Sequence, residues 1–109
     1  MVLLPSDNKF YNSKLFFSKN EITKIFNCYS LGVSRGNWRD YAISFNNKEA
    51  SFYMFKHSLA SPDCILTKKT KSKNNHYIYD LKLENKKKSN SNKIDDLLAL
   101  LKRRELKII

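Results

Sequence analysis

The most distinctive chemistry in this chain lies around the stretch GNWRDYAISF, residues 36–45, which holds its only tryptophan. Arg35 and Arg39 flank Trp38 in a chain that otherwise favours lysine. An arginine presents a planar fork of N–H donors where a lysine presents a point charge. Two such forks beside an indole would suit a phosphate or carboxylate group. A large buried indole could equally plug the corner where a helix turns into a sheet.

Lysines form a second set of candidate anion ligands. They recur along residues 68–73, where a strand runs into a turn, and again near residue 82. If the two strands around them pair, their basic ends meet near residues 71–76, and the last helix adds two arginines. The candidate contacts to nucleic acid or another anion are Arg35, Trp38, Arg39, Lys68, Lys69, Lys71, Lys73, Lys82, Arg103 and Arg104.

The formal net charge of +11 favours a polyanion as partner. Residues 1–63 hold 8 basic and 5 acidic side chains, a net +3, and residues 64–109 hold 13 and 5, a net +8. A lysine-rich and asparagine-rich composition also arises from an AT-rich genome, which would leave part of the charge without function. Compositional drift alone would spread the charge more evenly.

Catalytic signals are weak. A nucleophile with a base would have to combine Cys28 or Cys64 with His57 or His76, and the cysteines fall where small buried apolar residues are expected. The cysteines share no metal-type spacing, and two glycines cannot form a phosphate-cradling loop. We expect a protein that is not an enzyme, with reduced thiols and without metal, cofactor or small-molecule substrate.

The chain has no apolar run near the roughly 20 residues that a membrane-spanning helix needs. The opening MVLL, followed by Pro5, is too short for a secretory signal. We expect a soluble, cytoplasmic protein.

A helix over residues 19–34 is predicted ahead of the tryptophan. Ser18 and Glu21 have the spacing of a capping box, and Gly36 suits the position after the helix end. The expected buried stripe follows the helical period and consists of Ile22, Ile25, Phe26, Tyr29 and Val33.

The pattern then changes to alternation, which predicts four strands near residues 41–45, 50–56, 64–73 and 75–85. The second is apolar on both faces, as expected inside a sheet. In the fourth, Tyr77, Tyr79, Leu81 and Leu83 share one face and Ile78, Asp80 and Lys82 the other.

Residues 86–92, KKKSNSN, are predicted as a flexible linker to a last helix with Asn92 as N-cap. Its buried stripe is Ile94, Leu97, Leu98 and Leu101. The expected fold is a single small α+β domain at residues 14–107, after a loose lead-in at residues 1–13. Its order is α-β-β-β-β-α, a four-stranded antiparallel meander with two helices on one face.

The central block resembles a small alphaproteobacterial family known as domain of unknown function 2794, which looks like GEWRDYAI.F followed by A.F..F. Residues that match include Trp38, Arg39, Asp40, Tyr41 and Phe52. The resemblance runs from about residue 18 to 103 and departs in the final hairpin, which lacks glycine. Because the family has no assigned activity, the resemblance implies a fold and no function.

Two binding hypotheses stay open. The basic half could bind nucleic acid or a ribonucleoprotein, with stacking aromatics and phosphate contacts on the sheet. Alternatively, the uncovered sheet face could join a protein partner or a second copy of the chain, as an adaptor or homodimer. An anionic membrane is a third partner, although the last helix lacks the large basic amphipathic face expected for it.

Overall fold

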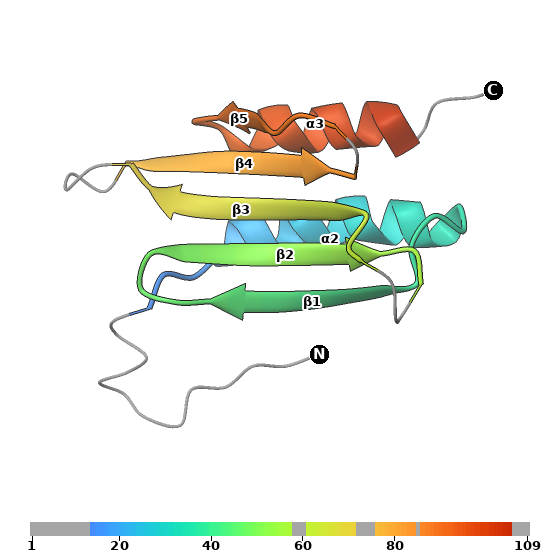
Figure 1. Cartoon of the computed structure of the whole chain (residues 1–109), viewed down its shortest axis with the longest axis horizontal. Coiled ribbons are helices and arrows are strands. Elements are labelled where there is room, and N and C mark those ends of the chain that lie inside the picture. Colours follow the sequence, from blue (N-terminus) through green and yellow to red (C-terminus); the bar gives the residue numbers. More distant parts are fainter. Residues whose placement is uncertain (1–13, 58–60, 72–75, 85, 106–109) are drawn as a thin grey trace.

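The computed structural model describes residues 14–57, 61–71, 76–84 and 86–105. Over these residues the chain forms one antiparallel sheet and two helices (Figure 1). The strands, in both chain order and sheet order, are β1 (Asp40–Phe45), β2 (Glu49–Phe55), β3 (Cys64–Thr70), β4 (Tyr77–Leu83) and β5 (Ser89–Ser91). Helix α2 (Lys19–Ser34) precedes the sheet and α3 (Ile94–Glu105) follows it. The predicted α+β architecture is confirmed, while the lead-in at 1–13 lies outside the described residues.

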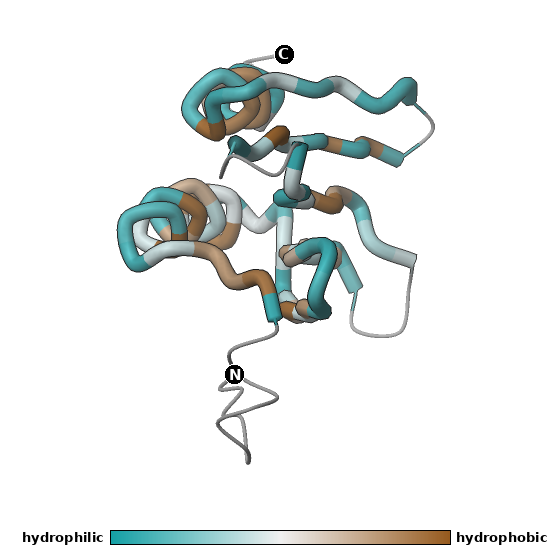
Figure 2. Tube along the Cα trace, turned by 90° about the vertical axis from the view of Figure 1, so that its left-hand side faces the viewer, coloured by the Kyte–Doolittle hydropathy of each residue, from teal (hydrophilic) through white to brown (hydrophobic). Residues whose placement is uncertain are grey.

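Both helices lie on the same side of the sheet, which leaves the opposite face uncovered (Figure 2). Every strand is antiparallel to its neighbour, and the register pairs Phe52 with Leu66 and Leu66 with Leu81. Because paired residues point to the same side, these side chains share the helix-covered face. The predicted faces of β4 are confirmed, and β2 lies inside the sheet as predicted.

Helix α2 begins as predicted. The Ser18 hydroxyl accepts from the Glu21 amide at 3.1 Å, and the Ser18 amide donates to Glu21 Oε1 at 2.7 Å. Past the helix end, Gly36 adopts a φ of 77°, in the left-handed region that glycine reaches without strain. The predicted stripe is wrong at Val33, which is 43% exposed. Cys28 and Gly32 take its place on the buried side, because the helix turns that side toward Trp38.

The fifth strand corrects the four-stranded prediction. Residues 86–92 were expected to form a flexible linker, but Ser89 pairs with Leu81 and Ser91 with Tyr79 to form β5. Its residues are serine and asparagine, so no apolar alternation marks it in the sequence. Such a strand forms because the backbone groups on the open edge of β4 need partners.

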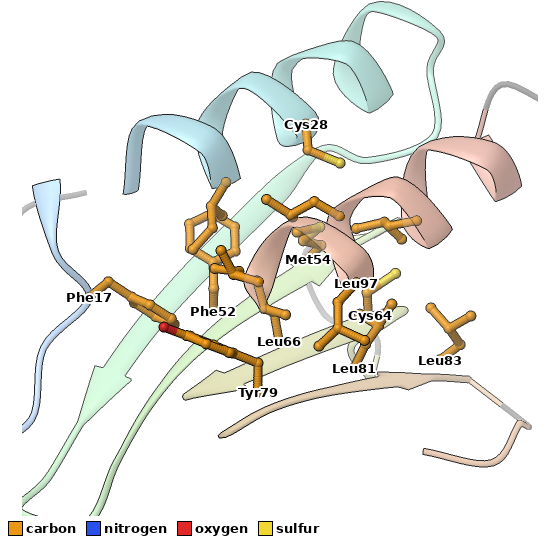
Figure 3. Packing of buried hydrophobic residues seen from close by; sticks show 14 of the residues in the cluster. Phe17, Cys28, Phe52, Met54, Cys64, Leu66, Tyr79, Leu81, Leu83 and Leu97 are labelled. Atoms are coloured by element: carbon orange, nitrogen blue, oxygen red, sulfur yellow. The ribbon is translucent and has the colours of Figure 1, made fainter. Parts of the chain in front are cut away.

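The core lies between the sheet and the helices. Figure 3 shows Phe52, Met54, Leu66 and Leu81 of the strands on the side of the sheet that the helices cover, with Leu97 of α3 beside Leu81. The predicted stripe of α3 is confirmed, since Ile94, Leu97, Leu98 and Leu101 are all buried. This core holds both helices in place and thereby sets where the charged segments at their ends lie.

Candidate functional site

The corner between α2 and β1 places Trp38 inside the protein and its flanking arginines outside. Trp38 is 1% exposed, and its indole is stacked on Tyr29 with ring centroids 6.0 Å apart. A Cβ atom at Gly32 would come within 2.1 Å of Trp38 Cε3, so only glycine leaves room for the ring. Arg35 and Arg39 are exposed. The indole therefore fills the corner, and the two guanidinium groups are on the surface.

Asp63 is a buried carboxylate that the sequence pattern does not single out. It is 2% exposed and lies just before β3. The Trp38 indole N–H donates to its Oδ2 at 2.9 Å, and Arg104 Nη2 donates to Oδ1 and Oδ2 at 2.9 and 3.1 Å. Burial by itself raises the pKa of the Asp63 carboxyl, but the hydrogen bonds from Arg104 and Trp38 outweigh burial and hold it below its usual value. Arg104, predicted as an anion ligand, thus binds a carboxylate of the protein itself.

Four elements, α2, β2, β4 and α3, finish at the same end of the molecule (Figure 1). The sheet register agrees, because Met54 of β2 pairs with Cys64 and Cys64 pairs with Leu83 of β4. We call this region the basic end. Its exposed basic residues are Arg35, Arg39, Lys56, Lys86, Lys87, Lys88, Lys102 and Arg103.

The basic end joins residues that are distant in the chain. Arg35 and Arg39 belong to the half of the sequence with the smaller charge, yet they share this end with the cations of the second half. Among the side chains that the structure describes there, the exposed acidic ones are Asp40 and Glu84. Positive charge therefore dominates the surface where the two helices end.

The open face of the sheet, opposite the helices, carries a shallow hollow of about 230 Å³. The hydroxyl groups of Ser51 and Thr67 lie in it 3.1 Å apart, and Tyr53 stands beside them. Lys82 and Lys88 also line the hollow. Because Lys88 belongs to the basic end as well, the hollow and the basic end form a continuous surface.

The side chains of Lys68 and Lys69 point to opposite faces of the sheet. Lys68 is 5% exposed on the helix-covered face, where its ammonium group donates to Glu21 Oε1 at 2.8 Å and to the Phe16 carbonyl at 3.0 Å. Lys69 points to the open face and lies 2.9 Å from Asp80 Oδ2. The sequence grouped these two lysines as anion ligands, but only Lys69 faces solvent. The ammonium group of Lys68 is buried and cannot contact an external anion in this structure.

Lys71 lies toward the other end of the sheet. The Lys71 amide donates to the His76 carbonyl at 2.8 Å, so the two strands pair as predicted. The prediction that their basic ends meet there is wrong, because the antiparallel register places Lys82 opposite Ile65, near the start of β3. Lys71 is exposed, and Lys73 lies outside the described residues. Since β3 runs away from the basic end, Lys69 and Lys71 are not gathered with Arg35, Arg39 and Arg103.

Glu21 is a second buried carboxylate, 8% exposed. Besides Lys68 and the Ser18 amide, it accepts from the Tyr79 hydroxyl. Burial raises the pKa of the Glu21 carboxyl, and the hydrogen bonds from Lys68 and Tyr79 reverse that effect and lower it. All three side chains are buried together, so this cluster ties α2 to the sheet and is not part of a surface.

The candidate nucleophiles are placed in the core. Cys28 and Cys64 are buried, and burial raises the pKa of the Cys64 thiol. Within the described ranges, no three His, Cys, Asp or Glu side chains gather closely enough to hold a metal ion. In the same part of the chain, no helix combines the length and apolarity needed to cross a membrane.

The fold and its surfaces define a small two-layer α+β domain with one strongly basic end. The chain belongs to the family described as Protein of unknown function (DUF2794), which matches it over residues 15–93. That range includes the GNWRDYAISF block, Asp63 and all five strands, and it ends just before α3. No curated protein and no solved structure matches the chain.

Proposed function

We propose that this protein is a non-enzymatic binding domain whose partner is a polyanion, in the first place a single-stranded nucleic acid. The proposal rests on one observation. Exposed cations from the end of α2, the end of β2, the segment after β4 and the last turn of α3 meet at one end of the molecule.

Such an arrangement suits a phosphate backbone. Lysine and arginine side chains that neutralise several phosphates release condensed counterions, which is the main source of sequence-independent affinity. Arg35 and Arg39 add planar forks that can hold a phosphate with two hydrogen bonds. Acidic neighbours are few on this surface, so the positive potential is not cancelled locally.

The open face supplies a path for the bases. Lys82 and Lys88 continue the positive charge from the basic end onto the sheet, beside the half-buried ring of Tyr53. Phe55 follows on the same face of β2 and is also half-buried. Bases of a single strand can stack on aromatic side chains irrespective of sequence, and we assign that role to these two rings.

A protein partner is less well supported by the surface. Among the described residues, the exposed large hydrophobic side chain is that of Val33, which lies on α2 and not on the open face. The hollow of the open face is lined by the Ser51 and Thr67 hydroxyls, the Asp80 carboxylate and several lysines, beside Tyr53 and Ile65. A hydrophobic adaptor or homodimer interface is built on a continuous exposed apolar patch, whereas polar and charged side chains interrupt this face.

Fluorescence anisotropy with labelled single-stranded RNA, single-stranded DNA and duplex DNA tests the proposal. If about six phosphates are contacted, affinity for a single strand should fall by roughly two to three decades between about 50 and 200 mM salt. Changing Lys86, Lys87 and Lys88 to Glu should weaken binding strongly. Changing Lys19, Lys48 and Lys93 to Glu gives a matched control, because these exposed lysines lie at the opposite end and the charge changes equally.

Equal losses in the two triple variants would contradict a defined surface and make the net charge the only determinant. Absence of binding by the wild-type protein at low salt would overturn the proposal. If that protein also has the mass of a dimer in solution, the open face becomes the first place to look for a protein interface.

A further inference from the structure

Asp63 contacts every segment that contributes to the basic end. Its carboxylate accepts from the Trp38 indole, which lies between Arg35 and Arg39, and from Arg104 of α3. Its amide donates to the Met54 carbonyl of β2 at 2.8 Å, and its carbonyl accepts from the Glu84 amide at 3.0 Å. The α2–β1 corner, β2, the segment after β4 and α3 are therefore all fastened to one residue.

The contact with Arg104 sets the position of the last turn of α3. The guanidinium Nη2 reaches both carboxylate oxygens, and Nη1 donates to Cys64 Sγ at 3.0 Å. Only 27% of the Arg104 side chain is exposed. A planar guanidinium held in this way fixes the direction of the helix end, and with it the neighbouring Lys102 and Arg103.

Asp63 also reaches toward a cation of the surface itself. Lys56 Nζ lies 3.7 Å from Asp63 Oδ1, while 52% of the Lys56 side chain remains exposed. A buried negative charge at the centre of the basic end reduces the mutual repulsion of the cations around it.

We propose that Asp63 is the positioning residue of the anion-binding surface: it holds the separate basic segments in one arrangement that a phosphate chain can contact. This inference rests on the proposed function. It assigns to a buried acidic residue a favourable effect on the binding of an anion, although the residue touches no ligand.

Simple electrostatics predicts the opposite effect, which makes the inference testable. Asp63→Asn raises the net charge of +11 by one unit, so charge alone predicts tighter binding to nucleic acid. Loss of positioning predicts weaker binding. Asp80→Asn is the matched control, because Asp80 is also mostly buried and ion-paired, and its loss frees Lys69 on the open face.

The experiment compares the two variants with the wild type in anisotropy titrations with a single-stranded RNA over a series of salt concentrations. We expect affinity to fall by about tenfold for Asp63→Asn and to stay equal or rise for Asp80→Asn. For Asp63→Asn the slope of log affinity against log salt should also become shallower by about 1 to 2, since fewer phosphates are contacted together. A purely structural role leaves this slope unchanged in the folded fraction of the protein.

Circular dichroism at the titration temperature establishes that each variant is folded. If Asp63→Asn does not fold, Arg104→Lys decides the question, because it keeps the charge and loses the planar group that bonds Asp63 and Cys64 together. Weaker binding and a shallower slope for Arg104→Lys support the inference. Wild-type affinity in a folded Asp63→Asn or Arg104→Lys protein overturns it, whereas a wild-type protein that does not bind refutes the proposed function instead.

Discussion

On the covered face of the sheet Lys68 is 5% exposed and hydrogen-bonded to Glu21, whereas on the open face Lys69 keeps 37% of its side chain exposed beside Asp80. Both pairs join an ammonium group to a carboxylate at nearly the same distance, 2.8 and 2.9 Å. The covered pair has exchanged water for protein partners, while the open pair can still exchange its partner for an external anion. Neighbouring residues of one strand thus have a structural role in one case and, under the proposed function, a binding role in the other.

The largest loss of stability should come from removing the buried lysine of the covered face. Lys68→Met leaves the Glu21 charge buried without its cation, and we expect a loss of about 3 to 5 kcal/mol in the free energy of unfolding. Urea unfolding measures it.

The double variant Glu21→Gln with Lys68→Met is the control for this prediction. Glutamine can keep the capping box at the start of α2, and no uncompensated charge remains, so much of the stability should return. A single Lys68→Met variant within about 1 kcal/mol of wild type would contradict the structural role of the covered pair.

A substitution at a buried glycine tests how tightly the covered side is packed. Gly32→Ala places a Cβ atom against the Trp38 ring, and we expect it to cost about 1 to 3 kcal/mol, measured by thermal unfolding. The second glycine separates crowding from backbone strain. A Cβ at Gly36 meets nothing within 4 Å, so Gly36→Ala should cost only the strain of its positive φ, about 1 kcal/mol. If Gly36→Ala is the more costly of the two, the corner around Trp38 is less rigid than the structure indicates.

Acid should lower the free energy of unfolding by protonating buried carboxylates. The pKa of Glu21 is lower in the folded protein than its ordinary value of 4.5, so its contribution to stability is complete above that value. Stability is then lost as the pH falls below about 4.5 and through the folded pKa. Asp63 acts in the same direction, with its pKa lowered from 3.8. Unfolding free energies measured from neutrality to well below these pH values should stay level at first and then decline, and Glu21→Gln should flatten the decline. A decline of equal steepness in that variant would assign it to other carboxylates.

The smallest effect is expected on the open face. Lys69→Met leaves the Asp80 carboxylate, 11% exposed like that of Glu21, without its cation. Because the lysine of this pair is 37% exposed and water reaches it, the loss in unfolding free energy should be smaller than for Lys68→Met, about 1 kcal/mol. Under the proposed function, the same variant should weaken nucleic-acid binding moderately, because its ammonium group lines the hollow. A large loss of stability would show that the two faces do not differ as described.

Several elements could be predicted because their signals are local. The capping box marked the start of α2, and the alternation in β4 assigned each side chain to its face. The error at Val33 has a tertiary cause, since the tryptophan that rotates the buried side of α2 toward Gly32 comes after the helix. β5 was missed because its pairing depends on the backbone of β4 and not on its own side chains.

The candidate site was predicted less completely. Arg35 and Arg39 are exposed as an anion ligand requires, and Lys82 faces the open side, but Trp38 and Lys68 are inside. In the sequence, Lys68 and Lys69 are two neighbouring lysines of one basic run. Which of them is buried depends on the face to which each side chain points and on which face the helices cover. Asp63 gave no signal, because a single aspartate after a proline is typical of a surface loop.

The sequence by itself determined the helices, most of the strands and the excess of positive charge, since each depends on residues within a few positions of one another. Only the tertiary structure decided which charges are buried, which are gathered at the basic end and which carboxylate joins them. The decisive contacts connect residues far apart in the chain: 47 positions separate Glu21 from Lys68, and 41 separate Asp63 from Arg104. Contacts over such separations form only after the core has brought α2 and α3 onto one face of the sheet, because no periodicity of the local sequence specifies them.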